Sequence, residues 1–257
     1  MNPLLDLSAH PVIAHRGASA YAPENTLSSF ELGLKQGADA LELDVRVTRD
    51  GAPVVVHDEV LDRTTDFTGT VRAHTLADLR QADAGHRFTA DGGRTYPYRG
   101  AGLRIPTLAE VLWSFPTTPV MVEVKEPEVQ DAVRRVLLEE RASERCVVAS
   151  EQAGALELFR EEPFACGASG AEISELYWSV MLRRARPWPR YRALSVPLRY
   201  KGLPVPTRAF VAAARRYGCP VHVWTINDAA TARRLWARGV AGIVTNVPDV
   251  VLAARTA

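Results

Sequence analysis

Short apolar segments rich in β-branched residues alternate with segments of helical spacing along almost the whole chain, and this alternation limits the possible folds more than any other feature. The segments expected to form strands are Pro11–His15, Ala40–Thr48, Val54–His57, Val120–Val124, Cys146–Ala149, Phe164–Ala168, Ala193–Val196, Pro220–Thr225 and Gly242–Thr245. The helical stretches between them include Thr26–Gln36, Val129–Glu140, Ala153–Arg160, Ala209–Tyr217 and Ala229–Ala237. Such alternation predicts a parallel sheet whose strands are joined by crossover helices.

The number of these units favours a closed barrel over an open sheet. If Val54–His57 forms a hairpin with the strand before it, about eight strand–helix units remain in 257 residues, which suits an α/β fold of the (β/α)8 TIM-barrel type. A doubly wound open sheet is the alternative, but no glycine-rich nucleotide-binding loop opens the first helix. Residues 59–106 are rich in Thr, Asp, Gly and Arg, and we expect them to be an insertion after the second-strand hairpin, over one mouth of the barrel. We therefore expect residues 1–257 to form a single domain.

Composition excludes several classes of protein. Hydrophobic residues make up 47% of the chain and charged residues 24%, so the chain can bury a sizeable core and is not disordered throughout. The net charge of +1 lacks the basic excess of a typical nucleic-acid binder, and no apolar run reaches the roughly 18 residues of a membrane helix. The first residues lack a secretory signal and the three cysteines lie far apart, so we expect a reducing compartment, the cytoplasm.

Two carboxylates and an imidazole are expected on one face of the predicted hairpin. Asp50 and Gly51 form a strong two-residue turn signal between two valine-rich strands. With this pair as the loop, Asp44 lies directly opposite His57, with Cβ atoms about 5 Å apart. Glu42 shares their face because side chains alternate along a strand. A solvated hairpin with ordinary polar residues is the alternative interpretation.

Polar residues also end two other predicted strands. Glu123 and Lys125 face the same way at the end of one strand, and His15 and Arg16 end the first strand. The carboxyl ends of barrel strands line the active site, so these positions favour a functional role over a salt-bridged strand end. Lys125 is one of only three lysines in a chain whose other basic residues are arginines. Its presence here indicates that the site requires the compact charge of an ammonium group. Arg16 can bind two oxygens of a phosphate.

Three carboxylates at one mouth would need compensation for their charge. Two like charges about 4 Å apart repel by about 4 kcal/mol at an effective dielectric constant of about 20. Either some of Glu42, Asp44 and Glu123 are protonated or a cation lies among them, and an all-oxygen ligand set prefers Mg²⁺ or Ca²⁺ to zinc. Two nearby histidines, His15 and His57, are suited to take a proton from a nucleophile and to give one to a leaving oxygen.

Other polar segments have simpler interpretations. Pro23–Thr26 is expected to be a turn followed by a helix start, and Asn227 or Asp228 is expected to cap the next helix. His222 is expected to be a buried barrel histidine with a satisfied ring and not a ligand. Trp224, at the end of the same strand, is expected to belong either to the core or to a wall of the substrate site.

Taken together, these motifs resemble those of the glycerophosphodiester phosphodiesterase family. The similarity runs from about residue 11 to residue 250, in order and at family-like spacing. The segments that carry it are His15-Arg16-Gly17, Pro23-Glu24-Asn25-Thr26, Glu42-Leu43-Asp44-Val45, Asp50-Gly51, His57-Asp58, Arg63-Thr64-Thr65, Ile105-Pro106-Thr107-Leu108, Glu123-Val124-Lys125, Trp224-Thr225-Ile226-Asn227 and the stretch from Gly239 to Pro248. The chain departs from the family at Ala241 and Asn246, where aspartate is frequent.

The resemblance implies a (β/α)8 barrel with an insertion at about residues 59–106. It also implies metal-assisted hydrolysis of a small-molecule phosphodiester to sn-glycerol 3-phosphate and an alcohol, in some members after the glycerol hydroxyl has attacked to give a cyclic phosphate. One divalent cation, Mg²⁺ or Ca²⁺, is implied as cofactor. The implied roles are metal binding by Glu42, Asp44 and Glu123, general acid/base catalysis by His15 and His57, phosphate binding by Arg16 and Lys125, and packing of Trp224 against the glycerol or alcohol.

Two other functions are alternatives. A lysophospholipase D-like activity on lysophospholipids is suggested by apolar residues 176–182 beside the arginine-rich residues 183–192, which could meet a lipid surface, although a solvated basic loop explains them more simply. The alternative of another class is a non-catalytic protein that binds phosphate esters. Such a protein would be expected to lack one of the two histidines or the three carboxylates, and all five are present.

Overall fold

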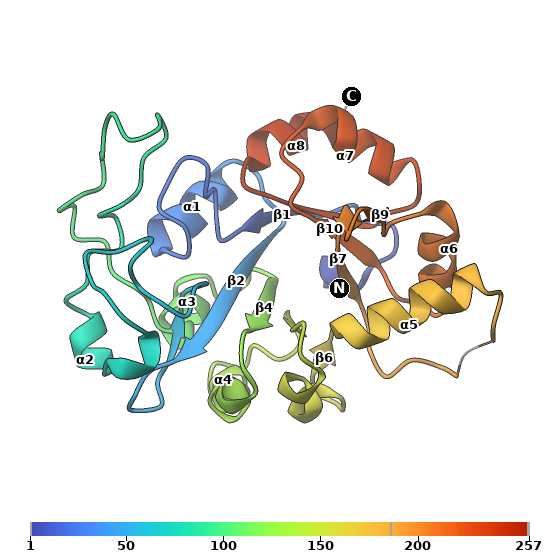
Figure 1. The fold of residues 1–257 in the computed structure, drawn as a ribbon, viewed down its shortest axis with the longest axis horizontal. Helices are drawn as coiled ribbons and strands as arrows, with labels where there is room; N and C mark the ends of the chain where they lie inside the picture. The colour runs from blue at the N-terminus through green and yellow to red at the C-terminus, as the bar shows by residue number, and fades with distance from the viewer. Residues whose placement is uncertain (1, 186, 256–257) are drawn as a thin grey trace.

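A computed structural model describes residues 2–185 and 187–255, and it confirms the predicted barrel. Eight parallel strands lie in the order β6-β5-β4-β2-β1-β11-β10-β7 within these residues, and β3 pairs antiparallel with β2 (Figure 1). A parallel bridge between Gly167 and Ala193 joins β6 to β7 and closes the ring. The strands are β1 (Val12–His15), β2 (Ala40–Val47), β3 (Pro53–Val55), β4 (Val120–Val124), β5 (Cys146–Ala149), β6 (Ala165–Cys166), β7 (Leu194–Pro197), β10 (Val221–Trp224) and β11 (Gly242–Thr245), with a separate hairpin of β8 (Arg199–Tyr200) and β9 (Leu203–Pro204).

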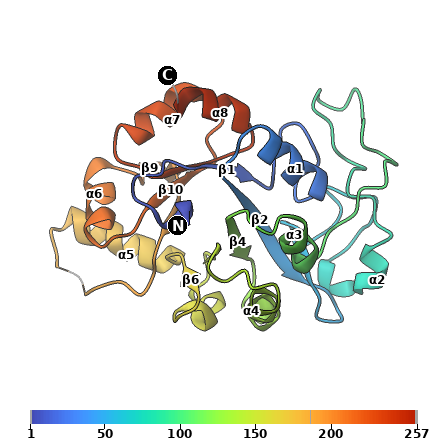
Figure 2. The same cartoon turned by 180° about the vertical axis from the view of Figure 1, so that it is seen from behind.

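Helices follow most of the strands and surround the barrel (Figures 1 and 2). They are α1 (Leu27–Lys35), α2 (Leu76–Leu79), α3 (Leu108–Ser114), α4 (Gln130–Glu139), α5 (Gly170–Met181), α6 (Arg208–Arg216), α7 (Ala229–Trp236) and α8 (Pro248–Arg255). Side chains of Thr26, Thr107 and Asp228 accept backbone N–H bonds at the starts of α1, α3 and α7, as expected for helix caps.

One predicted helix is wrong. Residues 153–160 form two short 3₁₀ turns, η4 (Ala153–Ala155) and η5 (Glu157–Phe159), in place of one α-helix. The segment contains Gly154, which disfavours a helix by about 1 kcal/mol relative to alanine. Phe159 is nevertheless buried in the core, so the spacing of apolar residues in this segment correctly indicates which side chains are buried.

The floor of the barrel is closed by the N-terminal segment, whose dark-blue end lies at the centre of both views (Figures 1 and 2). The 3₁₀ turn η1 (Pro3–Leu5) places the fully buried Leu4 in the interior cluster with Ile13 and Met121. The ring of His222, also fully buried, donates a hydrogen bond from Nε2 to the Leu4 carbonyl over 2.9 Å. Burial lowers the pKa of His222 to about 4, so the ring is neutral. The prediction of a buried barrel histidine is confirmed, but only Nε2 is hydrogen-bonded, and the buried Nδ1 has no hydrogen-bond partner among the described residues.

The insertion between β3 and α3 has a small core of its own. Leu61, Val71, Leu79 and Ile105 pack there with Val54 and Val56 of the hairpin, so insertion and hairpin share one cluster. The insertion carries the 3₁₀ turn η2 (Val71–Ala73) and α2, and it lies at the edge of the molecule opposite α5 (Figures 1 and 2).

The hairpin loop is one residue longer than predicted. Thr48 pairs with Ala52, since the Thr48 N–H donates to the Ala52 carbonyl over 3.0 Å, so Arg49, Asp50 and Gly51 form the loop. The Thr48 hydroxyl stabilises this arrangement by accepting from the Ala52 N–H at 2.9 Å and bonding to the Asp50 carboxylate at 2.6 Å. Gly51 has φ of 81°, the left-handed conformation that ends a three-residue loop.

The longer loop shifts the register by one residue and overturns the predicted Asp44–His57 pair. The ladder pairs Val45 with Val55, and the Val56 N–H donates to the Asp44 carbonyl over 3.0 Å. His57 therefore lies beyond the end of β3, where strand alternation no longer sets the direction of a side chain. Its backbone carbonyl is instead held by the Arg46 guanidinium, with Nε at 2.7 Å.

None of the helices within residues 2–185 and 187–255 combines the length and the apolar character needed to cross a bilayer.

Candidate active site

Five of the predicted residues come together at the carboxyl ends of neighbouring strands. The parallel register places His15 of β1 beside Glu42 of β2, and Asp44 of β2 beside Glu123 of β4. Lys125 follows directly after β4. Since all eight barrel strands run the same way, these side chains meet at one mouth of the barrel.

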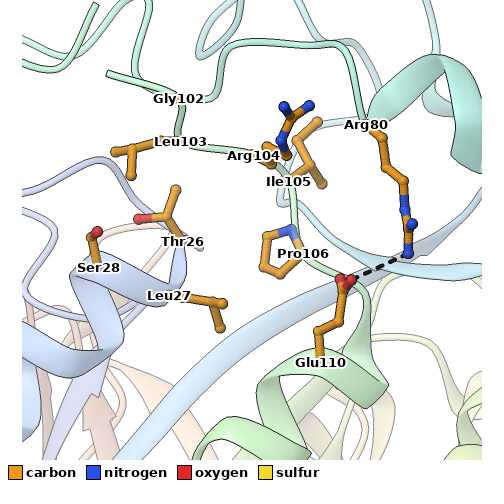
Figure 3. Close-up of a pocket in the computed structure, with 10 residues that line it drawn as sticks. All are labelled: Thr26, Leu27, Ser28, Arg80, Gly102, Leu103, Arg104, Ile105, Pro106 and Glu110. Atoms are coloured by element: carbon orange, nitrogen blue, oxygen red, sulfur yellow. Dashed lines mark hydrogen bonds and ion pairs between the residues drawn. The ribbon is translucent and has the colours of Figure 1, made fainter. Parts of the chain in front are cut away.

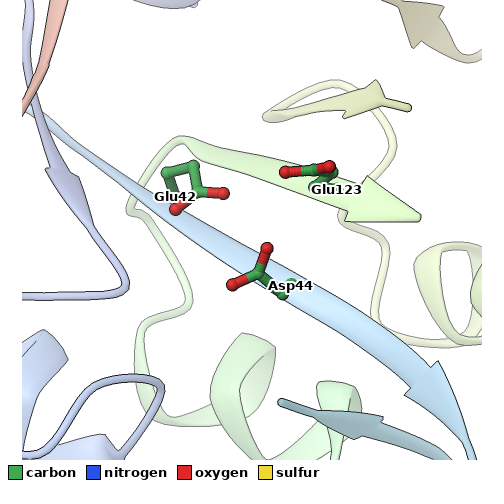
Figure 4. A group of neighbouring side chains, drawn as sticks. All are labelled: Glu42, Asp44 and Glu123. Atoms are coloured by element: carbon green, nitrogen blue, oxygen red, sulfur yellow. The ribbon is translucent and has the colours of Figure 1, made fainter. Parts of the chain in front are cut away.

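The three carboxylates form a compact cluster (Figure 4). Glu42, Asp44 and Glu123 each offer an oxygen within 4.8 Å of the others. Burial and the two neighbouring carboxylates raise the pKa of Glu42 well above its ordinary value, and burial also raises the pKa of Glu123. Burial pushes the pKa of Asp44 up too, but Lys125 and Arg16 outweigh it and bring that pKa to about 2. The set offers only hard oxygen donors, which fits Mg²⁺ or Ca²⁺.

Two cations lie against the central carboxylate. The Lys125 Nζ is 2.7 Å from Asp44 and 2.8 Å from Glu123, and the Arg16 Nε is 3.0 Å from Asp44. The backbone N–H of Arg16 also donates to the Glu42 carboxylate over 3.1 Å. The two residues predicted to bind phosphate are therefore part of the same charge cluster as the carboxylates.

His15 presents one nitrogen to the cluster. Its Nδ1 lies 2.6 Å from the Asn246 side-chain oxygen, which also accepts from the Ser19 hydroxyl. An amide oxygen only accepts, so Nδ1 carries the hydrogen and Nε2 is left facing Glu42 at 3.9 Å. Burial and the positive charge of Arg16 lower the pKa of His15 to about 4, which keeps the free ring neutral.

His57 is oriented by a carboxylate. Its Nδ1 lies 2.6 Å from Asp58, whose other oxygen binds Arg63. Burial tends to raise the pKa of Asp58, but the bonds from Arg63 and His57 lower it to about 2, so Asp58 is ionised and accepts. The Nε2 of His57 is therefore the atom available to a substrate.

Sequence reasoning missed several polar residues that contact the site, including Asn246 and Asp58 beside the two histidines and two residues of the turn before α1. The segment Pro23–Thr26 is a turn before α1, as predicted, but Glu24 binds the Arg16 guanidinium at 3.0 Å and the Asn25 amide donates to Asp44 over 2.9 Å. Asn25 is 3% exposed and has φ of 58°. Its N–H donates to the Arg16 carbonyl, which joins the two turns. The signal available in the sequence was the segment Pro23-Glu24-Asn25-Thr26 itself, which is among those that carry the family resemblance.

Trp224 ends β10, where it pairs with Pro197 of β7 and packs, partly buried, against the barrel interior. This position is at the same mouth as the carboxylates. Its contact with a substrate stays a prediction.

A cavity of about 450 Å³ lies beside this site and not within it (Figure 3). It is bounded by the start of α1, by residues 102–106 of the insertion and by an ion pair between Arg80 and Glu110 at 3.3 Å. A much smaller hollow touches Glu24, Asn25 and His57. None of the predicted site residues lines the larger cavity.

The segment proposed to meet lipids lies at the wrong end of the barrel for that role. Described residues from 183 to 192 connect the carboxyl end of α5 to the amino end of β7, whereas the carboxylate cluster lies at the carboxyl ends of strands; Arg186 lies outside the described residues. Trp188 packs edge-on against Tyr217 with ring centroids 5.3 Å apart. The segment therefore gives no support to a lysophospholipase D-like activity at this mouth.

Comparison with known proteins places this geometry in a family. The sequence model of the "Glycerophosphoryl diester phosphodiesterase family" matches residues 15–250. The chain is 32% identical over 255 residues to a glycerophosphodiester phosphodiesterase of Bacillus subtilis (strain 168), covering 93% of this chain and 84% of that protein. It is also 32% identical over 252 residues to a glycerophosphodiester phosphodiesterase of Caldanaerobacter subterraneus subsp. tengcongensis, and the match covers 94% of this chain and 96% of that protein.

Solved structures are similar over nearly the whole chain. A phosphodiesterase of Oleispira antarctica, solved in complex with the product sn-glycerol-3-phosphate, has a TM-score of 0.78 and 29% identity over 96% of this chain and 97% of its own. The corresponding domain of a Mycobacterium tuberculosis protein has a TM-score of 0.85 at 23% identity, covering 96% and 98%, and shows the same fold. The chain belongs to the glycerophosphoryl diester phosphodiesterase family.

Proposed function

We propose that this protein hydrolyses glycerophosphodiesters to sn-glycerol 3-phosphate and an alcohol with the help of one divalent cation, Mg²⁺ or Ca²⁺. The observation that carries the proposal is the convergence of Glu42, Asp44 and Glu123 within 4.8 Å at the barrel mouth, in a chain of this family. A relative solved with sn-glycerol-3-phosphate supports the product.

The three carboxylates would hold the cation. Bound there, it would stabilise negative charge that develops on the phosphoryl oxygens in the transition state. Asn25 keeps Asp44 in place for this role through its 2.9 Å hydrogen bond. Lys125 and Arg16 supply positive charge at the same mouth and would bind the oxygens of the phosphodiester, with Arg16 presenting a fork of donors.

His15 and His57 would be the general acid/base pair. In each ring Nδ1 is held by an acceptor, Asn246 or Asp58, and Nε2 is left for the substrate. One ring would take a proton from the attacking hydroxyl, of water or of the glycerol, and the other would give a proton to the leaving alcohol oxygen. Trp224 would pack against the glycerol or alcohol part.

The test is a panel of glycerophosphodiesters and lysophospholipids assayed with Mg²⁺ and with Ca²⁺. We expect turnover of water-soluble diesters such as glycerophosphocholine, loss of activity in EDTA, and recovery when cation is returned. Preferential turnover of a long-chain lysophospholipid would favour the lysophospholipase D-like alternative. Undiminished activity after confirmed metal removal would refute the role of the cation, and phosphate-ester binding without turnover would indicate a binding protein.

We also propose that residues 1–257 form one domain with residues 59–106 as an insertion. A cytoplasmic location is proposed because Cys146, Cys166 and Cys219 are all free and buried, which is typical of proteins in a reducing compartment. Cell fractionation tests the location, and limited proteolysis that released a stable fragment would contradict the single domain.

A further inference from the structure

Arg63, a residue of the insertion, contacts two different parts of the active site. Its Nε binds the Asp58 carboxylate, and its two terminal nitrogens bind the two oxygens of Glu24 at 2.7 and 2.8 Å. These carboxylates come from separate segments, one after β3 and one before α1. The guanidinium therefore joins two walls of the mouth that are far apart along the chain.

Each contact leads to one residue of the proposed mechanism. On one side, Asp58 accepts from Nδ1 of His57 at 2.6 Å. On the other side, Glu24 accepts from the Arg16 guanidinium at 3.0 Å. Hydrogen bonds from Arg63 and Arg16 outweigh the effect of burial and lower the pKa of Glu24, so Glu24 is an ionised acceptor for both.

The backbone that carries Arg63 is anchored in the core of the insertion. Leu61 is fully buried, and its carbonyl accepts from both the N–H and the hydroxyl of Thr65, which is 1% exposed. Arg63 lies inside this closed turn. The position of its guanidinium is thus set by the packing of the insertion and not by the barrel strands.

A lysine could not replace Arg63. Arginine has five N–H donors in a rigid planar fork, which can bind one carboxylate with Nε and chelate a second with both terminal nitrogens. An ammonium on a flexible stem would pair with one carboxylate at a time or with both at longer range.

We propose that Arg63 is a positioning residue of this enzyme, which orients His57 through Asp58 and Arg16 through Glu24. The kinetic effects expected of Arg63 rest on the proposed function. Its effect on the orientation of the His57 ring does not depend on that function. The insertion thereby has a role in the active site, because it supplies the residue that holds an acid/base group and a phosphate-binding group in one arrangement.

The kinetic test compares Arg63→Met and Arg63→Lys with the control Arg80→Met. Arg80 belongs to the same insertion and makes a comparably exposed ion pair, with Glu110, away from His57. With glycerophosphocholine and Mg²⁺, Arg63→Met should lower kcat and raise KM, for a combined loss of about 10- to 100-fold in kcat/KM. Arg63→Lys should recover only part of this, and Arg80→Met should stay within about twofold of the wild type. Wild-type kinetics for Arg63→Met, or full recovery by lysine, would overturn the proposal.

A double-mutant comparison separates positioning from general damage. If Arg63 acts on kcat through His57, adding Arg63→Met to His57→Ala should leave kcat where His57→Ala alone puts it. An equal fractional loss of kcat in both backgrounds would show that Arg63 acts independently of His57, which would overturn its proposed role in positioning His57.

A measurement without turnover keeps this proposal distinct from the proposed function. In protein labelled with ¹⁵N-histidine, the ring signals of His57 are identified by their loss in His57→Ala. These signals should shift in Arg63→Met and remain in place in Arg80→Met. Unchanged His57 signals in Arg63→Met would overturn the role of Arg63 even if the protein hydrolyses no diester, whereas a wild type inactive on every substrate would defeat only the proposed function.

Discussion

The Lys125 ammonium lies 2.7 Å from Oδ1 of Asp44, between that carboxylate and Glu123. The lysine side chain is only 12% exposed, so a longer, forked guanidinium has little room there. We expect Lys125→Arg to lower kcat/KM on the order of 10- to 100-fold although it keeps the charge. The control is Lys35→Arg, whose ion pair with Glu31 is exposed. Full activity of Lys125→Arg would remove the inference drawn from the scarcity of lysine.

Removal of one charge from the carboxylate cluster should weaken cation binding. Glu123→Gln keeps the shape of the side chain but replaces one anionic ligand by a neutral one. Calorimetric titration with Mg²⁺ and Ca²⁺ should show an affinity at least about 10-fold lower than that of the wild type. The control is Glu128→Gln, at an exposed ion pair with Arg72, which should bind both cations with wild-type affinity. Equal affinities for Glu123→Gln and wild type would place the cation elsewhere.

Loss of either active-site imidazole should reduce turnover without unfolding the protein. His15→Ala and His57→Ala each remove a side chain at the barrel mouth that lies outside the core clusters. We expect kcat to fall by about 10²- to 10⁴-fold, the usual contribution of a placed acid or base. The control is His86→Ala, whose ring pairs with Asp83 in the insertion. Steady-state assays measure turnover, and circular dichroism spectra show whether the variants are folded. Wild-type rates in both variants would contradict the assignment of His15 and His57 as the acid/base pair.

The barrel floor should make stability depend on pH. His222 has a pKa of about 4 in the folded protein and about 6.5 when unfolded, so between these values the unfolded chain binds more protons. Stability is therefore lost as the pH falls from about 6.5 to about 4, by roughly 3 kcal/mol for this group. His222→Gln keeps a donor for the Leu4 carbonyl and removes the titration. In urea unfolding at pH 7, 6 and 5, the free energy of unfolding should fall less with pH for His222→Gln than for the wild type. Equal falls in the two proteins would contradict the assignment of this pH dependence to His222.

The barrel and most of the site could be predicted because both follow from strand direction. Once strands are parallel, polar residues at their carboxyl ends must share a mouth, which is why His15, Glu42, Asp44 and Glu123 converge as expected. The hairpin register could not be predicted, because Asp50-Gly51 is the signal of a two-residue turn whereas the loop has three residues. The Thr48 hydroxyl, which extends the loop by one residue, gives no periodic signal.

Contacts between side chains from separate loops could not be predicted. The sequence around Glu24 indicates a turn and a helix start, and it carries no information about the contacts of Glu24 with Arg16 and Arg63. Which guanidinium meets which carboxylate depends on how two loops rise from different strands. A single sequence contains no measure of that distance.

The carbonyl of Leu4 and the ring of His222 are separated by 218 positions in the chain. Leu4 therefore cannot form this contact until β10 has been synthesised. Val244 of β11 belongs to the same buried cluster as Leu4 and Ile13, so the barrel floor is complete only when the first and the last barrel strands are both in place.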